Sequence, residues 1–284
     1  VIDYFVSEYL IGRTPNPCIA CNRAFRFQSL LQKARELEID YVATGHYARI
    51  VYDEKRKRYL LLKGKDGNKD QSYFLYGFRQ SELQQTLLPL GDYVKPQIRQ
   101  IARDLGLPVA EKAESQEICF IPDNDYRRFI QERSGLTLKP GPFLDREGNV
   151  LGQHQGIAYY TVGQRKGLGL ALGYPVYVID IDPGRNAVII GDMSQLKAAG
   201  LISIDNNFLP FDELTSPFLG QVKIRYRAAE VPALINPVSG GVRVEFIKPQ
   251  KAVTPGQTVV FYDNDLVIGG GTIDQRILPQ KEID

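Results

Sequence analysis

Two of the three cysteines of this chain lie in one short stretch, Gly12-Arg-Thr-Pro-Asn-Pro-Cys-Ile-Ala-Cys-Asn22. The two prolines predict an extended approach, because each disfavours the α region for the residue before it. Asn22 is a typical N-cap residue, so the spacing predicts a helix from about residue 22 with Cys21 at its N-terminus. The partial positive charge there favours a thiolate, and the stretch therefore indicates a nucleophilic thiol near neutral pH.

Metal binding and a purely structural role are alternatives for the same stretch. Cys-x-x-Cys is also half of a zinc site, but a tetrahedral site needs two more ligands. The chain offers only Cys119, His46 and His154 for them. Cys119 lies between Ile118 and Phe120 in a short apolar run, where a free cysteine is most often buried and inert. The residues alone leave thiol chemistry, zinc and structure open.

The segments that follow predict an α/β unit that would position the thiols. Apolar residues recur at helical spacing through 22–38, and the apolar run 39–44 predicts a buried strand that ends before Gly45 and His46. In such a sheet, ligands gather at the carboxyl ends of the strands. Gly45 would let a ligand approach the backbone, and His46 would point into the same crevice, although a structural histidine is the commoner alternative.

Turn signals and periodicity predict the remaining elements of this half. They are a hairpin at 47–62, a helix at 72–76, a helix at 95–105 and a helix at 125–133. Lys69, Asp70 and Gln71 stand directly before the second of these elements. Polar side chains at a helix start can hold a phosphate or a ribose hydroxyl, or can simply cap the helix.

From about Gly135 the pattern changes to short strands and frequent glycine, which predicts a β-rich half. A hairpin is predicted at 176–191, and the C-terminal part resembles a small antiparallel barrel. Lys223, Arg225 and Arg227 alternate along one predicted strand and would face the same side. Such a stripe could bind an RNA backbone or could be a solvated face of the barrel.

Length and composition are those of an ordinary globular protein. The chain has 284 residues, of which 43% are hydrophobic and 24% charged, enough for two or three domains. No apolar run approaches the length of a membrane span, so we expect no membrane partner. Three cysteines do not make a secreted disulfide framework, and we expect a cytoplasmic protein. The net charge of +2 means that any RNA contact must come from local patches.

Six ordered motifs resemble those of the tRNA-specific 2-thiouridylases, which replace the 2-oxygen of the wobble uridine of tRNA with sulfur. The motifs are Gly12–Asn22, Ala43–Arg49, Lys69–Phe74, Glu114–Phe120, Tyr160–Gly167 and Pro255–Gln257. One such motif is weak, whereas six in this order are specific. The resemblance implies an α/β and all-β multidomain fold. Its expected parts are a truncated Rossmann-like, ATP-pyrophosphatase-like domain at 1–121, a central β-rich tRNA-binding domain at 122–194 and a C-terminal antiparallel β-barrel at 195–284.

The resemblance also implies a chemistry. ATP, with Mg²⁺, adenylates the uridine oxygen, and a protein persulfide then attacks the activated carbon. Cys119 is implied as the persulfide carrier and Cys21 as the partner thiol, which can cleave the persulfide or close a disulfide with Cys119. Gly45 is implied as an ATP contact, and a cysteine desulfurase or sulfur-relay protein as the sulfur donor. The residues implied to face the target base or bind tRNA are Asn16, Pro17, Cys18, His46, Lys69, Asp70, Gln71, Arg225, Tyr226 and Gln257.

The sequence departs from the family pattern in two places. Many members carry aspartate where this chain has Cys18, so no carboxylate role is assigned there. The family's glycine- and serine-rich pyrophosphate loop is not present before Val1. We therefore expect that the chain as given does not use ATP alone. Two other functions stay open: another pyrophosphate-loop ligase that modifies tRNA, and a non-catalytic zinc or RNA-binding module.

Overall fold

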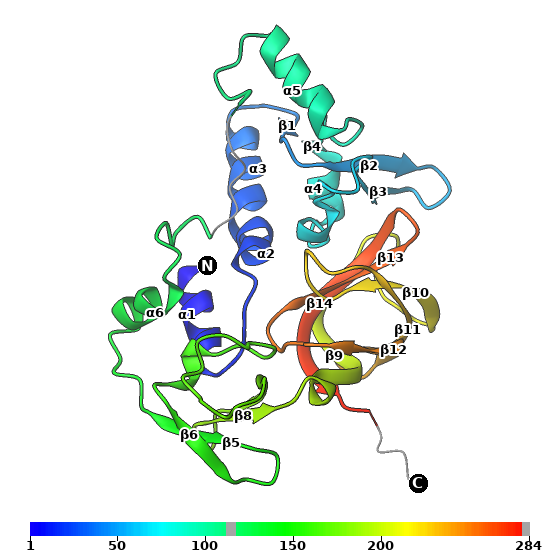
Figure 1. The fold of residues 1–284 in the computed structure, drawn as a ribbon. Helices are drawn as coiled ribbons and strands as arrows, with labels where there is room; N and C mark the ends of the chain where they lie inside the picture. The colour runs from blue at the N-terminus through cyan, green and yellow to red at the C-terminus, as the bar shows by residue number, and fades with distance from the viewer. Residues whose placement is uncertain (112–117, 280–284) are drawn as a thin grey trace.

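The computed structural model describes residues 1–111 and 118–279 and has three parts (Figure 1). Residues of all three parts line one cavity, which we call the hollow. An α/β part comes first, a four-stranded sheet with its helix follows, and a β-barrel ends the chain. Within the described residues, no helix has the length and apolar character needed to cross a membrane.

The α/β part has short strands and one long helical run. Its elements are α1 (Ile2–Leu10), α2 (Pro17–Cys21), a π-helical turn (Asn22–Arg26), α3 (Phe27–Glu36), β1 (Val42–Ala43), β2 (Ala48–Asp53), β3 (Arg58–Lys63), a 3-10 turn (Ser72–Phe74), α4 (Gln80–Gln84), β4 (Thr86–Leu87) and α5 (Lys95–Asp104). The hairpin and the helix near 95–105 are therefore confirmed, whereas the helix predicted at 72–76 is only a 3-10 turn.

The predicted start of the first long helix was wrong by five residues. The helical run begins at Pro17, because Asn16 is extended and its Oδ1 accepts a hydrogen bond from the Ile19 backbone N–H at 3.3 Å. Proline suits this first position, where the missing N–H would have no helical partner. Asn22 has helical dihedral angles and lies inside the run, so Cys21 is not at the helix N-terminus. Cys18 occupies the first turn instead.

The strand predicted at 39–44 was also wrong in length and burial. Only Val42 and Ala43 pair, in parallel with β4, and the side chains of Ile39 and Tyr41 are exposed. The apolar composition of this segment suggested burial on both faces, which the structure does not show within the described residues. The pair still places Gly45 and His46 at the carboxyl end of a parallel strand, as predicted.

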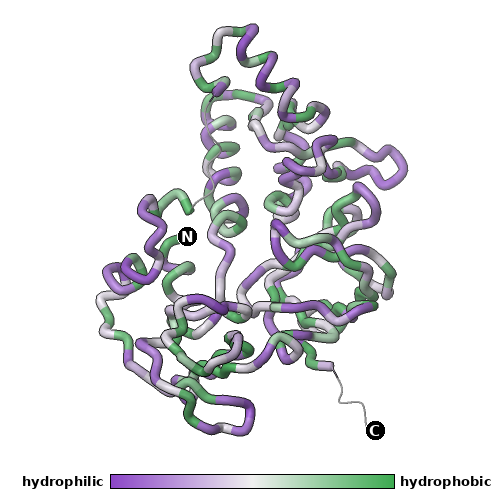
Figure 2. Tube along the Cα trace, viewed as in Figure 1, coloured by the Kyte–Doolittle hydropathy of each residue, from purple (hydrophilic) through white to green (hydrophobic). Residues whose placement is uncertain are grey.

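The β2–β3 hairpin connects the α/β part to the barrel. Leu62 of β3 pairs with Leu266 of a barrel strand, and the Lys63 backbone N–H donates to the Asp265 carbonyl at 2.9 Å. Figure 2 shows the hairpin tip as hydrophilic, in keeping with the six charged residues at 53–58. This pairing fixes the α/β part against the barrel on one side of the hollow.

The middle part is a small sheet with one covering helix. Its elements are α6 (Tyr126–Ser134), β5 (Gly141–Leu144), β6 (Val150–His154), a 3-10 turn (Ile157–Tyr159), β7 (Tyr177–Asp182), β8 (Ala187–Gly191) and a 3-10 turn (Ser194–Leu196), with strand order β6-β5-β8-β7. The helix predicted at 125–133 and the hairpin predicted at 176–191 are confirmed. Asp125 caps α6 by accepting from the Arg128 backbone N–H at 3.0 Å.

Helix α1 belongs to the first segment of the chain but packs on the middle part. Phe5 and Tyr9 share a buried cluster with Ile121, Ile130 and Ala158. The Phe5 ring also meets the Phe120 ring edge-on, with centroids 5.4 Å apart. This packing anchors the segment 118–121 beside the hollow.

The C-terminal part is a closed antiparallel barrel of six strands. They are β9 (Lys197–Phe208), β10 (Phe218–Lys223), β11 (Val231–Val238), β12 (Gly241–Lys251), β13 (Thr258–Asp263) and β14 (Leu266–Ile277). The ring runs β13-β10-β11-β12-β9-β14 and closes by pairing β13 with β14. Closure leaves no free edge, and the interior is filled with aliphatic and phenylalanine side chains such as Val244, Ile235 and Phe261. The barrel is thus a rigid wall for the hollow.

Candidate active site

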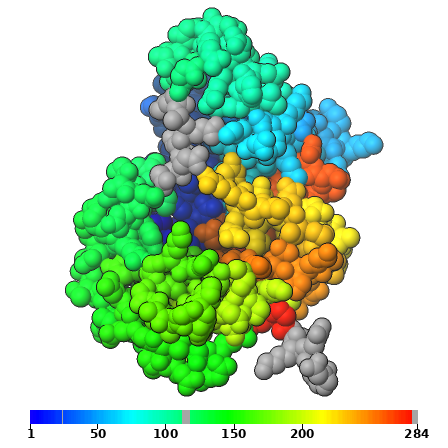
Figure 3. Space-filling model, viewed as in Figure 1, coloured from blue at the N-terminus to red at the C-terminus, as the bar shows by residue number. Residues whose placement is uncertain are grey.

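A cavity of about 1660 Å³ lies where the three parts meet. In the space-filling view, dark blue atoms from the start of the chain are recessed between the middle part and the barrel (Figure 3). The lining residues are Val1, Ile2, Asp3, Pro17, Cys18, Cys21, Asn22, Phe25, Arg26, Gly45, His46, Tyr47, Gly67, Asn68, Lys69, Asp70, Gln71, Phe74, Lys95, Ile118, Cys119, Phe120, Arg133, Lys223, Tyr226, Arg227, Ala228 and Ala229. All three cysteines of the chain are among them.

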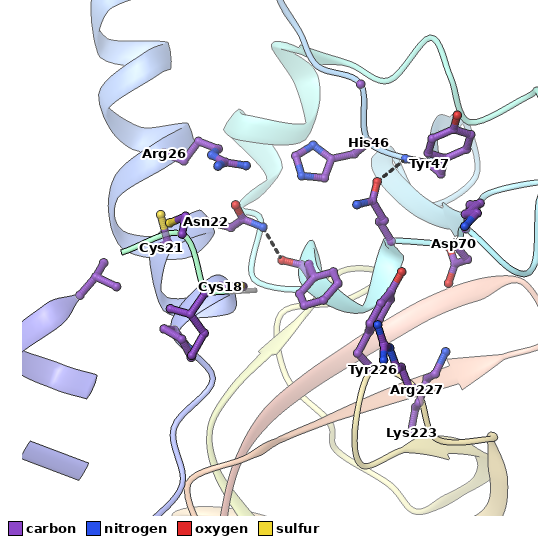
Figure 4. Close-up of a pocket in the computed structure, with 18 of the residues that line it drawn as sticks. Cys18, Cys21, Asn22, Arg26, His46, Tyr47, Asp70, Lys223, Tyr226 and Arg227 are labelled. Carbon is purple, nitrogen blue, oxygen red and sulfur yellow. Dashed lines mark hydrogen bonds between the residues drawn. The ribbon is translucent and has the colours of Figure 1, made fainter. Parts of the chain in front are cut away.

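The helical run from Pro17 forms one wall of the cavity. We call this run and Cys119 together the thiol wall. The lining residues of the run recur at intervals of three and four, which is the spacing of one helix face. They are Cys18, Cys21, Asn22, Phe25 and Arg26. Figure 4 labels all of these except Phe25. The Asn22 side chain donates to the Phe74 carbonyl at 3.3 Å and so ties this face to the neighbouring 3-10 turn.

Cys119 reaches the same cavity from a distant part of the sequence. Its side chain is exposed, while Ile118 and Phe120 on either side pack against the cluster around α1 and α6. The alternative prediction of a buried Cys119 is therefore wrong. The three cysteines are all free thiols. Surrounding atoms desolvate the Cys18 sulfur and, with Cys119 and Cys21 nearby, raise the pKa of that thiol above its ordinary value.

Gly45 and His46 line the cavity from the end of β1. Gly45 is exposed, and a Cβ added there would meet only the Leu90 side chain, at 3.4 Å, so its backbone is open to a ligand. His46 Nδ1 lies 2.9 Å from Thr44 Oγ1. Burial, with help from the Arg26 guanidinium, lowers the pKa of His46 to about 4. The imidazole is therefore neutral at pH 7 and can exchange hydrogen bonds without carrying charge.

The segment Lys69–Gln71 lines the cavity and is itself held by hydrogen bonds. The buried Asp70 carboxylate accepts from the backbone N–H groups of Gly64 and Ser72 at 3.0 and 3.1 Å, and from Ser72 Oγ at 2.8 Å. Gln71 Oε1 accepts from the Tyr47 backbone N–H at 3.0 Å (Figure 4). Asp70 and Gln71 thus fix the loop that presents Lys69.

The barrel contributes the opposite wall, which we define as Lys223, Tyr226 and Arg227 and call the cationic wall (Figure 4). The Tyr226 ring packs against the Phe74 ring with centroids 4.4 Å apart, and Lys223 Nζ lies 5.8 Å from the Tyr226 ring centre. The predicted stripe along one strand was wrong, because β10 ends at Lys223 and residues 224–228 form bends and turns. Turning the chain there separates Arg225 from Arg227.

Three predicted tRNA-binding residues do not line the cavity. Asn16 caps α2, and Arg225 is exposed on the turn after β10. Gln257 donates through Nε2 to the carbonyls of Thr14 and Pro15, at 3.0 and 3.4 Å. Asn16 and Gln257 therefore fix the loop that delivers α2 to the cavity.

Several lining residues were not recognised from the sequence as site residues. Phe25 and Arg26 follow Cys18 and Cys21 at helical intervals, so the spacing signal was present once the helix start is placed at Pro17. Lys95 and Arg133 reach the cavity from α5 and α6, and no local motif marks them.

Metal binding finds no support in these side chains. In residues 1–111 and 118–279, no three His, Cys, Asp or Glu side chains form a group that could hold a metal ion. The described donors therefore offer no complete ligand set for a structural zinc ion. Residues Glu114–Glu117 of the motif that contains Cys119 lie outside the described residues.

Comparison with protein families matches each part of the chain. Residues 1–123 match the tRNA methyl transferase HUP domain, residues 127–192 the tRNA methyl transferase PRC-barrel domain, and residues 200–273 the aminomethyltransferase beta-barrel domain. A HUP domain is Rossmann-like, so the predicted multidomain fold of an α/β part followed by β-rich parts is confirmed.

Curated relatives agree over nearly the whole chain. It is 58% identical to the tRNA-specific 2-thiouridylase MnmA of Moorella thermoacetica over 275 residues, which are 96% of this chain and 77% of that protein. It is 56% identical to the tRNA-specific 2-thiouridylase MnmA of Carboxydothermus hydrogenoformans, over 98% of this chain and 76% of that protein. Identity of this extent places the chain in the tRNA-specific 2-thiouridylase family.

Proposed function

We propose that this protein transfers sulfur to C2 of the wobble uridine of tRNA, with ATP as co-substrate. The observation that carries the proposal is the convergence of Cys18, Cys21 and Cys119 on one cavity whose other wall is cationic. Thiols on one side can deliver sulfur, and cations on the other can hold a polyanion. The cavity of about 1660 Å³ is large enough for a nucleotide extruded from its strand.

The proposed reaction begins with activation of the uridine. ATP adenylates O2, releasing pyrophosphate, so that AMP becomes the leaving group at C2. Gly45 contacts ATP in this proposal, since its backbone is open in the cavity wall. The neutral His46 imidazole contacts the tRNA through a hydrogen bond and not through charge. Pro17 and Cys18 face the target base from the first turn of α2, and Asn16 holds that turn in place.

Sulfur transfer uses the two distant thiols. An upstream donor passes its terminal persulfide sulfur to the Cys119 thiolate and leaves as a thiolate. The terminal sulfur of Cys119 then attacks C2, and AMP departs with the electron pair of the C–O bond. The Cys21 thiolate attacks Cys119 Sγ, the S–S bond to the transferred sulfur breaks, and 2-thiouridine and a Cys21–Cys119 disulfide result. A thiol reductant supplies two electrons to restore both thiols.

Binding of the tRNA is proposed to involve both walls. Lys69 contacts the tRNA, and Asp70 and Gln71 hold its loop at the cavity edge. Tyr226 offers a ring face for stacking beside Lys223 and Arg227. Arg225 and Gln257 contact the tRNA at the margin of the cavity, outside its lining.

Nucleoside mass analysis tests the proposal. The full-length protein is incubated with ATP, a persulfide donor and a tRNA that has a wobble uridine. Sulfur in place of oxygen adds about 16 mass units to that uridine, whereas a ligase that attaches an amino acid would add far more. An unmodified uridine, or an amino acid adduct, would contradict the proposal.

A further inference from the structure

A second cavity, of about 440 Å³, opens beside the first along helix α5. Its lining residues are Asp66, Asn68, Lys69, Lys95, Pro96, Arg99 and Arg103. Asn68, Lys69 and Lys95 also line the first cavity, so the two are continuous. Four of the seven lining side chains are cationic and one is acidic. The second cavity is therefore a basic extension of the site that holds the thiols.

The cations of α5 form a regular row. Lys95, Arg99 and Arg103 are spaced four residues apart, which places them along one face of the helix with about 6 Å between neighbours. None of the residues of α5 is buried, so this helix contributes little to a core. A row of cations on a helix that packs so loosely suits a ligand with regularly repeated negative charge.

The acidic side chain of this cavity does not neutralise the row. The Asp66 carboxylate is buried and accepts from the backbone N–H groups of Asn68 and Lys95, at 3.1 and 2.9 Å. It thereby fixes the start of α5 against the loop that carries Lys69. Arg103 pairs with Glu111 at 2.7 Å, and both side chains are at least half exposed. An exposed pair of this kind is weak because water screens it, so a phosphate can compete for Arg103.

We propose that Lys95, Arg99 and Arg103 bind successive phosphates of the tRNA strand that enters the first cavity. The proposal rests on the proposed function, because it extends the path of the same substrate. It predicts that the RNA runs from the cationic wall past Lys69 and along α5. A single phosphate would need one or two of these cations, whereas a strand can use all three.

Salt dependence of tRNA binding tests the row. We expect R99A/R103A to lose about tenfold in affinity at 0.1 M salt and to lower the slope of log affinity against log salt by about 1.4 to 1.8, the loss for two phosphate contacts. Arg185→Ala is the matched control, since Arg185 pairs with Asp182 on the β7–β8 turn and lines neither cavity. Its binding should equal that of the wild type.

Glu111→Gln provides a second test, in which tRNA affinity is expected to rise and not to fall. Removing the carboxylate that competes for Arg103 should raise tRNA affinity by about two- to fivefold, and R103A should abolish this gain. If the wild type binds tRNA normally and R99A/R103A has the same slope of log affinity against log salt, the proposal that the α5 cations bind phosphates is contradicted. The proposed function is not contradicted by that result. Absence of tRNA binding by the wild type would overturn the proposed function as well. Competition by tripolyphosphate at the row, without any effect of the variants on tRNA, would identify a nucleotide phosphate site and overturn the RNA proposal.

Discussion

The two walls of the large cavity differ in what they offer a substrate. The thiol wall brings three free thiols from a helix and from the segment around Cys119. The cationic wall offers Lys223, Tyr226 and Arg227 from a closed barrel and contains no thiol. Under the proposed function the two walls have different roles: the thiol wall reacts with the substrate and the cationic wall binds it. Changes on the two walls should therefore affect different measured quantities.

The largest effect is expected on the thiol wall. Cys119→Ser in the full-length protein should lower tRNA thiolation by at least about a thousandfold, because a hydroxyl cannot carry a persulfide, and should leave tRNA affinity unchanged. Nucleoside mass analysis and a binding titration measure the two quantities. Arg185→Ala, which changes a residue outside the cavity lining, is the control and should retain thiolation. Retained thiolation in Cys119→Ser would remove the proposed role of that residue.

His46, which lines the cavity from the end of β1, gives the fold a stability that depends on pH. Because its pKa is about 4 in the folded protein and about 6.5 when unfolded, the neutral imidazole stabilises the fold fully above pH 6.5. This contribution, up to about 3 kcal/mol, is lost as the pH falls from 6.5 to 4. Urea unfolding at pH 7 and pH 4.5 measures it. The loss should be smaller in His46→Asn than in the wild type, and equal losses would contradict the buried neutral state.

Changes on the cationic wall should affect binding more than chemistry. The double change K223A/R227A should weaken tRNA binding by about tenfold and reduce its salt dependence, while thiolation at saturating tRNA stays within about twofold. Arg225→Ala is informative beside it, because Arg225 lies on the same turn but outside the cavity lining. Unchanged tRNA affinity in K223A/R227A would contradict the proposal that the cationic wall binds tRNA while the thiol wall reacts.

The smallest effect concerns the start of the thiol wall. Asn16→Ala removes the side-chain cap of α2 and should cost about 1 kcal/mol of unfolding free energy. Asn16→Asp keeps an acceptor and should retain most of the stability. Denaturant titration measures the unfolding free energy of both variants. Equal loss in both would mean that the cap does not stabilise the helix.

The sequence predicted the general architecture well, because its signals are local. Glycine-rich turns and alternating strands identified the β-rich half, and helical periodicity identified α5 and α6. The start of the thiol helix was missed because Asn22 and Asn16 are both typical N-cap residues, and only the hydrogen bond to Ile19 distinguishes them. The length of β1 depends on its pairing with β4, and hydrophobic periodicity does not show which strands are neighbours in space.

The site was predictable only where a motif marks it. The six motifs named Cys21, Cys119, Gly45 and His46, and the structure brings these four to one cavity. Long-range packing of α1 and α6 puts Cys119 there, and no local pattern encodes that arrangement. The cations of α5 were not predicted as site residues. Their row is visible in the sequence, but a row of lysine and arginine on a helix usually indicates only a solvated face.

A single-turnover experiment tests the reacting wall most directly. Full-length protein loaded with one persulfide per molecule reacts once with ATP and tRNA without reductant, and its peptides are then mapped by mass spectrometry. We predict that 2-thiouridine forms together with an equal amount of Cys21–Cys119 disulfide. Formation of 2-thiouridine while Cys21 and Cys119 both remain reduced would contradict the account.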